Sequence, residues 1–308
     1  MCIRDRAEAS TLLDKMEAAV KNGGTVTTAE ASALIASCKE LTIRLALPEG
    51  TASALNPLDY TALIQTPDFE KDGVNSIEGW SGTSGYNFGN DDTQKSALML
   101  EFYNKTFDLY QDVALANVPN GNYKLSLSAF YRFGSTADDY AKWTEDPNCG
   151  TTKLYAVSGG ETFETPVALL SSGAGEEQVG AGSEVTVGDG LYVPNDMVSA
   201  NAYFTLDNPR YLNELVVKVT DGKLRVGIKK DANVGSDWVI MDSWRLTYYG
   251  NDEVPDGIES IEGNAGAPVK VEYFSIDGMK LSKPSKGVVI KRSTDAAGNV
   301  TVKTVVVK

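Results

Sequence analysis

Apolar residues near the start of the chain recur at three- and four-residue steps from Leu12 to Val20, which is the period of one face of an α-helix. After an Asn-Gly-Gly break, Thr27 and Glu30 have the spacing of a capping box, in which each side chain bonds the backbone amide of the other residue. A second apolar stripe follows, so residues 1–46 are predicted to form a helical hairpin. Because two short helices bury little core by themselves, we expect this hairpin to be the end of a longer helical region.

Past a linker at residues 47–63 that contains Pro, Gly and Ser, the hydrophobic period changes to two, as in half-buried strands. The alternation recurs over residues 107–113, 125–131, 215–219, 224–228 and 238–248. Asp221 and Gly222 separate the third and fourth of these segments and favour a tight hairpin turn. Many short strands without long helices between them indicate a sandwich. Residues 64–250 are therefore predicted to form a mainly β domain, an antiparallel β-sandwich of the jelly-roll type.

The composition changes at two further places. Residues 171–190 are rich in Gly, Ser and Glu and lack the strand-then-helix setting of a phosphate-binding loop, so a mobile loop is predicted there. Residues 269–308 hold eight Lys and Arg against three Asp and Glu, although the whole chain has a formal charge of −14. This change of sign, after a linker at residues 251–266, predicts a separate small β-domain at residues 267–308.

The chain contains no histidine, which removes the commonest general base and the commonest metal ligand at neutral pH. Its negative charge disfavours nucleic acid as a partner, and no apolar run approaches the roughly 20 residues needed for a membrane span. The sequence has no Gly-x-Ser-x-Gly or P-loop motif, and no spacing singles out a pair of carboxylates for glycoside hydrolysis. The sequence therefore predicts a protein that is not an enzyme.

Several short motifs carry a resemblance to a known family. Thr66–Glu70 is followed by Gly79–Trp80, and then by residues 101–111, 119–132 and 224–249. With these motifs in this order, residues 64–250 resemble the galactose-binding-like jelly rolls that serve as carbohydrate-binding modules in secreted bacterial polysaccharide-processing proteins. The resemblance implies a binding module whose partner is a polysaccharide or another glycan.

A second resemblance concerns the C-terminus. Tyr273–Lys280, Lys286–Ile290 and a final Val-Lys run follow the pattern of a strand, a turn, a Gly-led strand and a basic end. Residues 257–308 in this way resemble the C-terminal sorting domain of the type IX secretion system, with an insertion at residues 293–298. This resemblance implies the export machinery as a partner and an extracellular or cell-surface location.

Jelly rolls of this type commonly bind a structural calcium ion where the first strand meets the last. The resemblance implies that Glu70 and Asp242 are the matching positions here. Calcium takes several oxygen ligands, which a carboxylate pair and backbone carbonyls can supply. The alternative is that both carboxylates only accept hydrogen bonds from backbone groups at strand ends.

Glycan binding in such modules relies on aromatic rings that stack on a sugar and on polar side chains that bond its hydroxyls. Two aromatic-rich loops are predicted to supply these groups, and the candidates are Tyr86, Phe88, Tyr131, Arg132, Tyr140 and Trp143. For Tyr140 and Trp143, packing within the loop is the alternative. Trp80, Trp238 and Trp244 are expected in the core, the last two because they alternate in phase with apolar neighbours.

We therefore expect a non-catalytic, secreted or cell-surface carbohydrate-binding protein. Two alternatives stay open: an adhesin-like structural surface protein that binds a protein partner, and the C-terminal fragment of a glycoside hydrolase. An exposed flat apolar patch would favour a protein partner, whereas a cleft with solvent-facing aromatic rings would favour a sugar.

Overall fold

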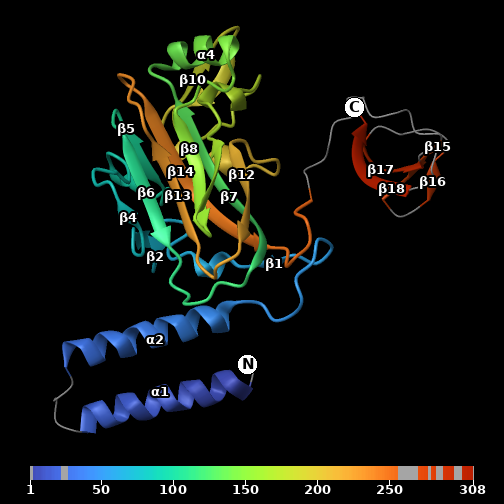
Figure 1. The fold of residues 1–308 in the computed structure, drawn as a ribbon. Helices are drawn as coiled ribbons and strands as arrows, with labels where there is room; N and C mark the ends of the chain where they lie inside the picture. The colour runs from blue at the N-terminus through green and yellow to red at the C-terminus, as the bar shows by residue number, and fades with distance from the viewer. Residues whose placement is uncertain are drawn as a thin grey trace. The chain divides into compact units, whose positions relative to one another are not determined.

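The computed structural model describes residues 3–21, 27–255, 270–276, 279–281, 287–294 and 300–307. The chain divides into two compact units, Met1–Val254 and Pro255–Lys308. The first unit contains a helical hairpin and a β-sandwich, and the second contains a small antiparallel sheet (Figure 1). The predicted fold class, mainly β with an antiparallel sandwich, is confirmed.

The predicted hairpin consists of α1 (Ile3–Lys21) and α2 (Thr28–Ala46). Its capping box is confirmed, since Thr27 Oγ1 accepts a hydrogen bond from Glu30 N at 3.2 Å and Glu30 Oε2 accepts one from Thr27 N at 2.9 Å. Ile43 of α2 packs against the core of the sandwich, so α2 is the helix that attaches the hairpin. Among the described residues, no helix is long and apolar enough to cross a membrane.

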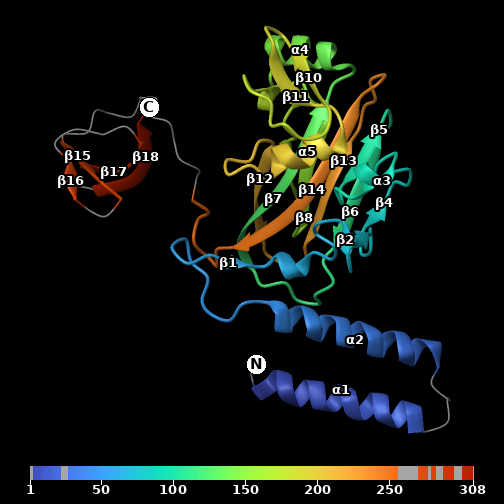
Figure 2. The same ribbon diagram turned by 180° about the vertical axis from the view of Figure 1, so that it is seen from behind.

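Two antiparallel sheets enclose the main core (Figures 1 and 2). The first sheet has the order β1 (Leu58–Asp59), β14 (Trp238–Tyr248), β7 (Gly121–Arg132) and β12 (Leu212–Val219), and β5 (Leu100–Tyr103) also pairs with β14. The second sheet has the order β4 (Ser81–Gly82), β6 (Phe107–Asp112), β13 (Arg225–Lys230), β8 (Thr152–Ser158) and β9 (Glu161–Pro166). A 3₁₀ turn, η1 (Thr61–Leu63), and a short hairpin of β2 (Glu70–Lys71) and β3 (Val74–Asn75) precede β4 along the chain. Leu125, Leu127 and Ala129 alternate inward along β7, as the sequence pattern predicts.

Asp221 and Gly222 do not close a hairpin, and this prediction was wrong. Strand β12 pairs with β7 in the first sheet, whereas β13 pairs with β6 and β8 in the second. The turn therefore carries the chain from one sheet to the other. Alternation shows which side chains of a strand face a core. Because both sheets face the same core, alternation does not show whether two consecutive strands pair with each other or lie in opposite sheets.

A β-bulge divides β14 into two parts. The register of β14 against β7 shifts between Asp242 and Arg245, so the residues that face the main core have odd numbers before the bulge, as in Met241, and even numbers after it, as in Trp244. Before the bulge, Trp238 and Ile240 face away from the main core, and after it Trp244 faces into the main core. Both tryptophans are buried, as predicted, but they belong to different cores.

The stretch predicted as a mobile loop instead forms a layer over the outer face of the first sheet. It contains η2 (Leu170–Gly173) and β10 (Glu184–Val187), which pairs with β11 (Leu191–Pro194) and leads on to α5 (Met197–Phe204). Val187 and Val193 of this layer are buried in a second core, against the outward side chains of the sheet. Glu184 links this segment to α5, since its Oε1 accepts a hydrogen bond from Tyr203 Oη at 2.7 Å and its Oε2 accepts one from Gly180 N at 2.9 Å. The segment therefore contains a strand and packed apolar residues that the prediction, which gave weight to the glycines, did not include, while its mobility stays a prediction.

The second unit is a four-stranded antiparallel sheet in the order β16 (Lys280–Leu281), β15 (Lys270–Phe274), β17 (Gly287–Thr294) and β18 (Val300–Val307). The small C-terminal β-domain is therefore confirmed. The expected turn at residues 277–278 and residues 295–298 of the expected insertion lie outside the described residues.

Candidate ligand-binding site

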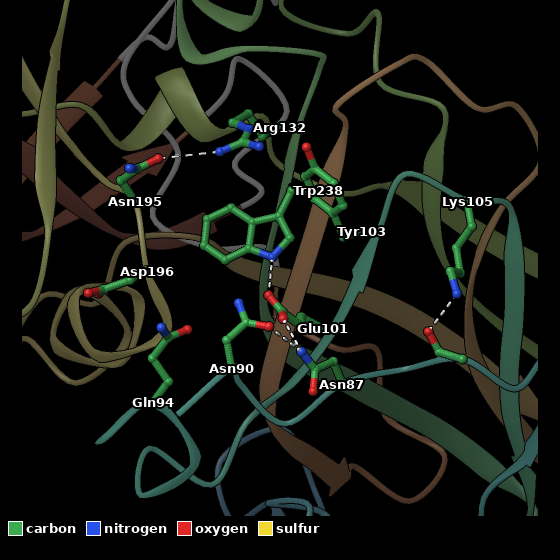
Figure 3. A pocket seen from close by; sticks show the side chains of 11 residues that line it. Asn87, Asn90, Gln94, Glu101, Tyr103, Lys105, Arg132, Asn195, Asp196 and Trp238 are labelled. Carbon is green, nitrogen blue, oxygen red and sulfur yellow. Dashed lines mark hydrogen bonds between the residues drawn. The ribbon is translucent and has the colours of Figure 1, made fainter. Parts of the chain in front are cut away.

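A cavity of about 460 Å³ lies on the outer face of the first sheet, beside the second core (Figure 3). Its floor comes from three neighbouring strands: Glu101 and Tyr103 of β5, Arg132 at the end of β7, and Trp238 at the start of β14. One wall is formed by Asn87 and Asn90 and by Gln94 of α3 (Asp92–Lys95). Asn195 and Asp196, which precede α5, form a second wall, and Gly85 and Lys105 complete the lining.

Strand alternation places these side chains in the cavity. Leu100 and Phe102 of β5 point into the main core, so Glu101 and Tyr103 between and beyond them point outward. Tyr131 points into the main core, so Arg132, the next residue of β7, faces outward like Glu101 and Tyr103. Because β14 pairs with β5 on one side and β7 on the other, Trp238 lies between the outward side chains of both.

Glu101 is the buried acid of the cavity, with 8% of its surface exposed. Its Oε2 accepts a hydrogen bond from Trp238 Nε1 at 2.6 Å, and its Oε1 accepts one from Asn87 Nδ2 at 3.0 Å. Asn87 Nδ2 also donates to Asn90 Oδ1 at 3.1 Å. Burial raises the pKa of Glu101 above its usual range, and these donors oppose the rise only in part.

Arg132 is held by neutral acceptors. Its guanidinium donates to Gly134 O at 3.0 Å, to Ser236 O at 3.0 Å and to Asn195 Oδ1 at 3.4 Å. It also lies over the indole of Trp238, 5.2 Å from the ring centroid. Burial lowers the pKa of this guanidinium below its usual value, although arginine stays charged at neutral pH.

The remaining charged groups are also anchored. Asp196 is the N-cap of α5: its Oδ1 accepts from Ser199 N at 2.8 Å and its Oδ2 from Ser183 N at 2.9 Å. Lys105 Nζ donates to Gly85 O at 2.8 Å. Tyr103 is 52% exposed, and its ring is the solvent-facing aromatic surface of the cavity.

Of the residues predicted to bind a ligand, Arg132 lies in this cavity and Tyr131 does not. Tyr131 is 0% exposed and packs in the main core, so it cannot present its ring to a sugar. The prediction placed it in a loop, but β7 extends through Arg132 and turns the tyrosine inward.

Tyr86 and Phe88 are half-buried and pack against the main core, with ring centroids 5.5 Å apart. Asn87 between them faces the opposite way, toward the cavity. In this segment, the side chain that lines the cavity is therefore the polar one between the two aromatic residues, and ligand binding by Tyr86 and Phe88 stays a prediction.

Tyr140 and Trp143 lie on a helix, α4 (Thr136–Glu145), and the loop predicted there was wrong. Ser135 and Asp138 form a capping box that starts this helix. Trp143 packs against the main core and Tyr140 against the second core, and their ring centroids are 5.9 Å apart. Packing thus accounts for both rings, while a contact with a ligand stays a prediction.

The calcium prediction concerned Glu70 and Asp242. Glu70 Oε1 accepts a hydrogen bond from Gly73 N. Asp242 Oδ1 is buried without a partner in the described part of the chain, and burial together with nearby Asp68 raises the Asp242 pKa to about 7. An open carboxylate oxygen suits a cation, yet within the described ranges no three His, Cys, Asp or Glu side chains form a group that could hold a metal ion. Calcium at this position therefore stays a prediction.

The sequence interpretation missed Glu101, Asn87, Asn195 and Trp238. Trp238 was assigned to the core from its spacing, and it is indeed 4% exposed, but its indole N–H faces the cavity acid. Glu101 sits between Leu100 and Phe102 in a strand, where a single acid between apolar residues marks an outward position. This pattern in the sequence indicates that Glu101 faces outward, but it does not show which segments cover the outer face of the sheet.

The protein is thus a mainly β sandwich with a polar, aromatic-floored cavity on its outer face. No protein-family model and no curated protein matches the chain. Among solved structures, it is similar to an arabinose-bound α-L-arabinofuranosidase, with 9% identity and a TM-score of 0.27. The match covers 59% of this chain and 26% of the arabinofuranosidase. A likeness this low assigns neither a family nor a function.

Proposed function

We propose that the protein is a non-catalytic glycan-binding protein whose ligand occupies the cavity between α3 and α5. The observation that carries the proposal is the row of outward side chains Glu101, Tyr103, Arg132 and Trp238 on three adjacent strands. Sugars are bound where an aromatic ring covers an apolar ring face and where fixed polar groups meet the hydroxyls. Tyr103 offers the exposed ring, and the walls offer amides.

Hydrogen-bonding groups left open in the cavity support this proposal. In the part of the chain that the structure describes, Asn90 Nδ2, Asn195 Nδ2 and Tyr103 Oη have no hydrogen-bond partner. Their side chains are nevertheless held in place, since the oxygens of Asn90 and Asn195 accept bonds from Asn87 and Arg132. Fixed amides with open donors can bind hydroxyls at a small entropic cost.

The carboxylates of the cavity favour binding over catalysis. A glycosidase uses one carboxyl as an acid and another as a nucleophile or base, with oxygens that face the substrate. Here each oxygen of Glu101 and of Asp196 already accepts a hydrogen bond from the protein. Both acids therefore serve to hold the walls and the floor, and a glycoside hydrolase reading would need a different site.

The resemblance of residues 257–308 to a secretion sorting domain supports placing this binding outside the cell. An exported protein at the cell surface would meet polysaccharides there.

A retention experiment on immobilised polysaccharides tests the proposal. Tyr103→Ala removes the exposed ring and should weaken retention about tenfold. Leu212→Ala is the matched control, because Leu212 is 46% exposed on β12 of the same sheet and is not part of the cavity lining. Equal retention of both variants would contradict the assignment of the cavity. Binding of a protein partner without binding of any glycan would favour the adhesin-like alternative.

A further inference from the structure

Two cations in the cavity have no carboxylate partner. Lys105 donates to the backbone carbonyl of Gly85, and Arg132 donates to two carbonyls and one amide oxygen. The negative charges of Asp139, Asp237 and Glu101 act on Arg132 from nearby, but within the described ranges neither Arg132 nor Lys105 forms an ion pair or a hydrogen bond with a carboxylate. Cations whose N–H groups are open to a cavity are suited to an anionic group of a ligand.

The acids of the same cavity are not free to neutralise these cations. Glu101 is held by Trp238 Nε1 and Asn87 Nδ2, and Asp196 by two backbone amides at the start of α5. Movement of either acid toward Lys105 or Arg132 would break these bonds and leave buried donors unsatisfied.

The open groups in the cavity are mostly donors. Arginine has five N–H groups, and three of those on Arg132 are used, which leaves one on each terminal nitrogen. Asn90 and Asn195 present open amide N–H groups, and Lys105 keeps further ammonium hydrogens beyond its bond to Gly85. A ligand that satisfies this cavity must be rich in acceptors and carry negative charge. A guanidinium can bind the planar carboxylate of a uronate through two parallel N–H···O bonds, as it can bind a phosphate.

We infer that the cavity binds an acidic saccharide that contains uronate units, whose carboxylates are balanced by Arg132 at one side of the cavity and by Lys105 at the other (Figure 3). This inference rests on the proposed glycan-binding function and names the class of glycan. The ring of one uronate lies against Tyr103, and its hydroxyls face Asn90 and Asn195.

The test compares acidic polysaccharides with their own carboxyl-reduced, neutral forms. Polygalacturonate, alginate and glucuronoxylan are measured by affinity electrophoresis and calorimetry, with dextran and dextran sulfate as further probes. We expect binding to at least one uronate polymer, about tenfold weaker binding to its reduced form, and weaker binding at high salt.

Variants locate the charge. Lys105→Gln should lose about tenfold in affinity for the uronate polymer, and Lys218→Gln, which removes an exposed lysine of β12 outside the cavity, should lose nothing. Arg132→Lys keeps the charge but not the planar fork, and should also weaken the binding of the carboxylate form. Circular dichroism checks that each variant is folded.

The outcomes separate the two proposals. If neutral and acidic forms bind equally and Tyr103→Ala abolishes both, the glycan-binding function stands and the uronate inference is overturned. If dextran sulfate binds and no carboxylated polymer does, or if Lys105→Gln binds like the native protein, the uronate inference is also overturned. If no polysaccharide binds at all, both proposals are wrong.

Discussion

A buried ion pair in the sandwich gives the sharpest test of the fold. Lys230 Nζ contacts Asp237 Oδ2, and the exposed fractions of both side chains are 0%. Lys230 also donates to Asn233 Oδ1 at 3.2 Å, and Asp237 Oδ2 accepts from Val234 N at 2.9 Å. Lys230 occupies an inward position of β13, two residues after Ile228 of the main core. The substitution Asp237→Ala would leave the ammonium group of Lys230 in the core without a counter-ion.

The expected loss in the free energy of unfolding follows from the burial of this ion pair. Removal of one partner of a buried pair costs about 3–5 kcal/mol, and loss of the bond to Val234 N adds about 1 kcal/mol. For a unit of this size, about 2–4 °C of melting temperature is lost per kcal/mol, so Asp237→Ala should melt about 10–20 °C lower. Replacement of both residues, with Lys230→Met and Asp237→Ala, removes the unpaired charge and should recover most of the loss.

Urea unfolding followed by tryptophan fluorescence at neutral pH measures these differences. The control is Asp112→Ala, which breaks an ion pair with Arg225 in which the aspartate is 65% exposed, and should cost less than about 1 kcal/mol. An Asp237→Ala loss no larger than that of the control would refute the reasoning. So would a double variant less stable than Asp237→Ala alone.

Three further predictions concern stability. In calcium-free buffer, burial and Asp68 raise the pKa of Asp242 to about 7, well above the pKa of an aspartate in the unfolded chain. The free energy of unfolding should therefore fall by up to about 4 kcal/mol as the pH rises from about 4 to 7. Asp242→Asn should flatten this pH dependence, and identical pH profiles of urea unfolding for the two proteins would contradict the prediction. Millimolar calcium should raise the melting temperature of the native protein at pH 8 and leave Asp242→Asn unchanged; an equal response of both would remove Asp242 from the predicted site. A Cβ at Gly227 would lie 2.6 Å from the Tyr155 ring, so Gly227→Ala should cost about 1–3 kcal/mol in urea unfolding, and an unchanged midpoint would contradict that contact.

The strands of the sandwich could be predicted because alternation is a local property. Leu125, Leu127 and Ala129 face the main core wherever β7 sits in its sheet. The pairing of strands could not be predicted in this way, since β12 and β13 face the same core from opposite sheets. The bulge after Asp242 is equally hidden, because one extra residue changes the face of Trp238 relative to Trp244 without altering the composition.

The candidate site was harder to predict than the fold. Glu101 and Trp238 lie 137 positions apart in the chain and meet only because β5 pairs with β14. Arg132 was predicted as a polar group beside the aromatic residues and lines the cavity, whereas Tyr131, Tyr86 and Phe88 were chosen for their rings and pack against the core. Aromatic content indicated segments near the cavity, but the alternation of side chains along each strand determines which residue lines it.

A nuclear magnetic resonance titration tests the central claim, that the cavity on the outer face binds the glycan. The chain has four tryptophans, so its ¹H–¹⁵N spectrum contains four indole N–H signals, and Trp238→Phe assigns the one that bonds Glu101. A glycan that binds as proposed should shift the Trp238 signal and leave those of Trp80 and Trp244 in place. Saturating glycan that shifts the Trp143 signal instead, with Trp238 unmoved, would contradict the account.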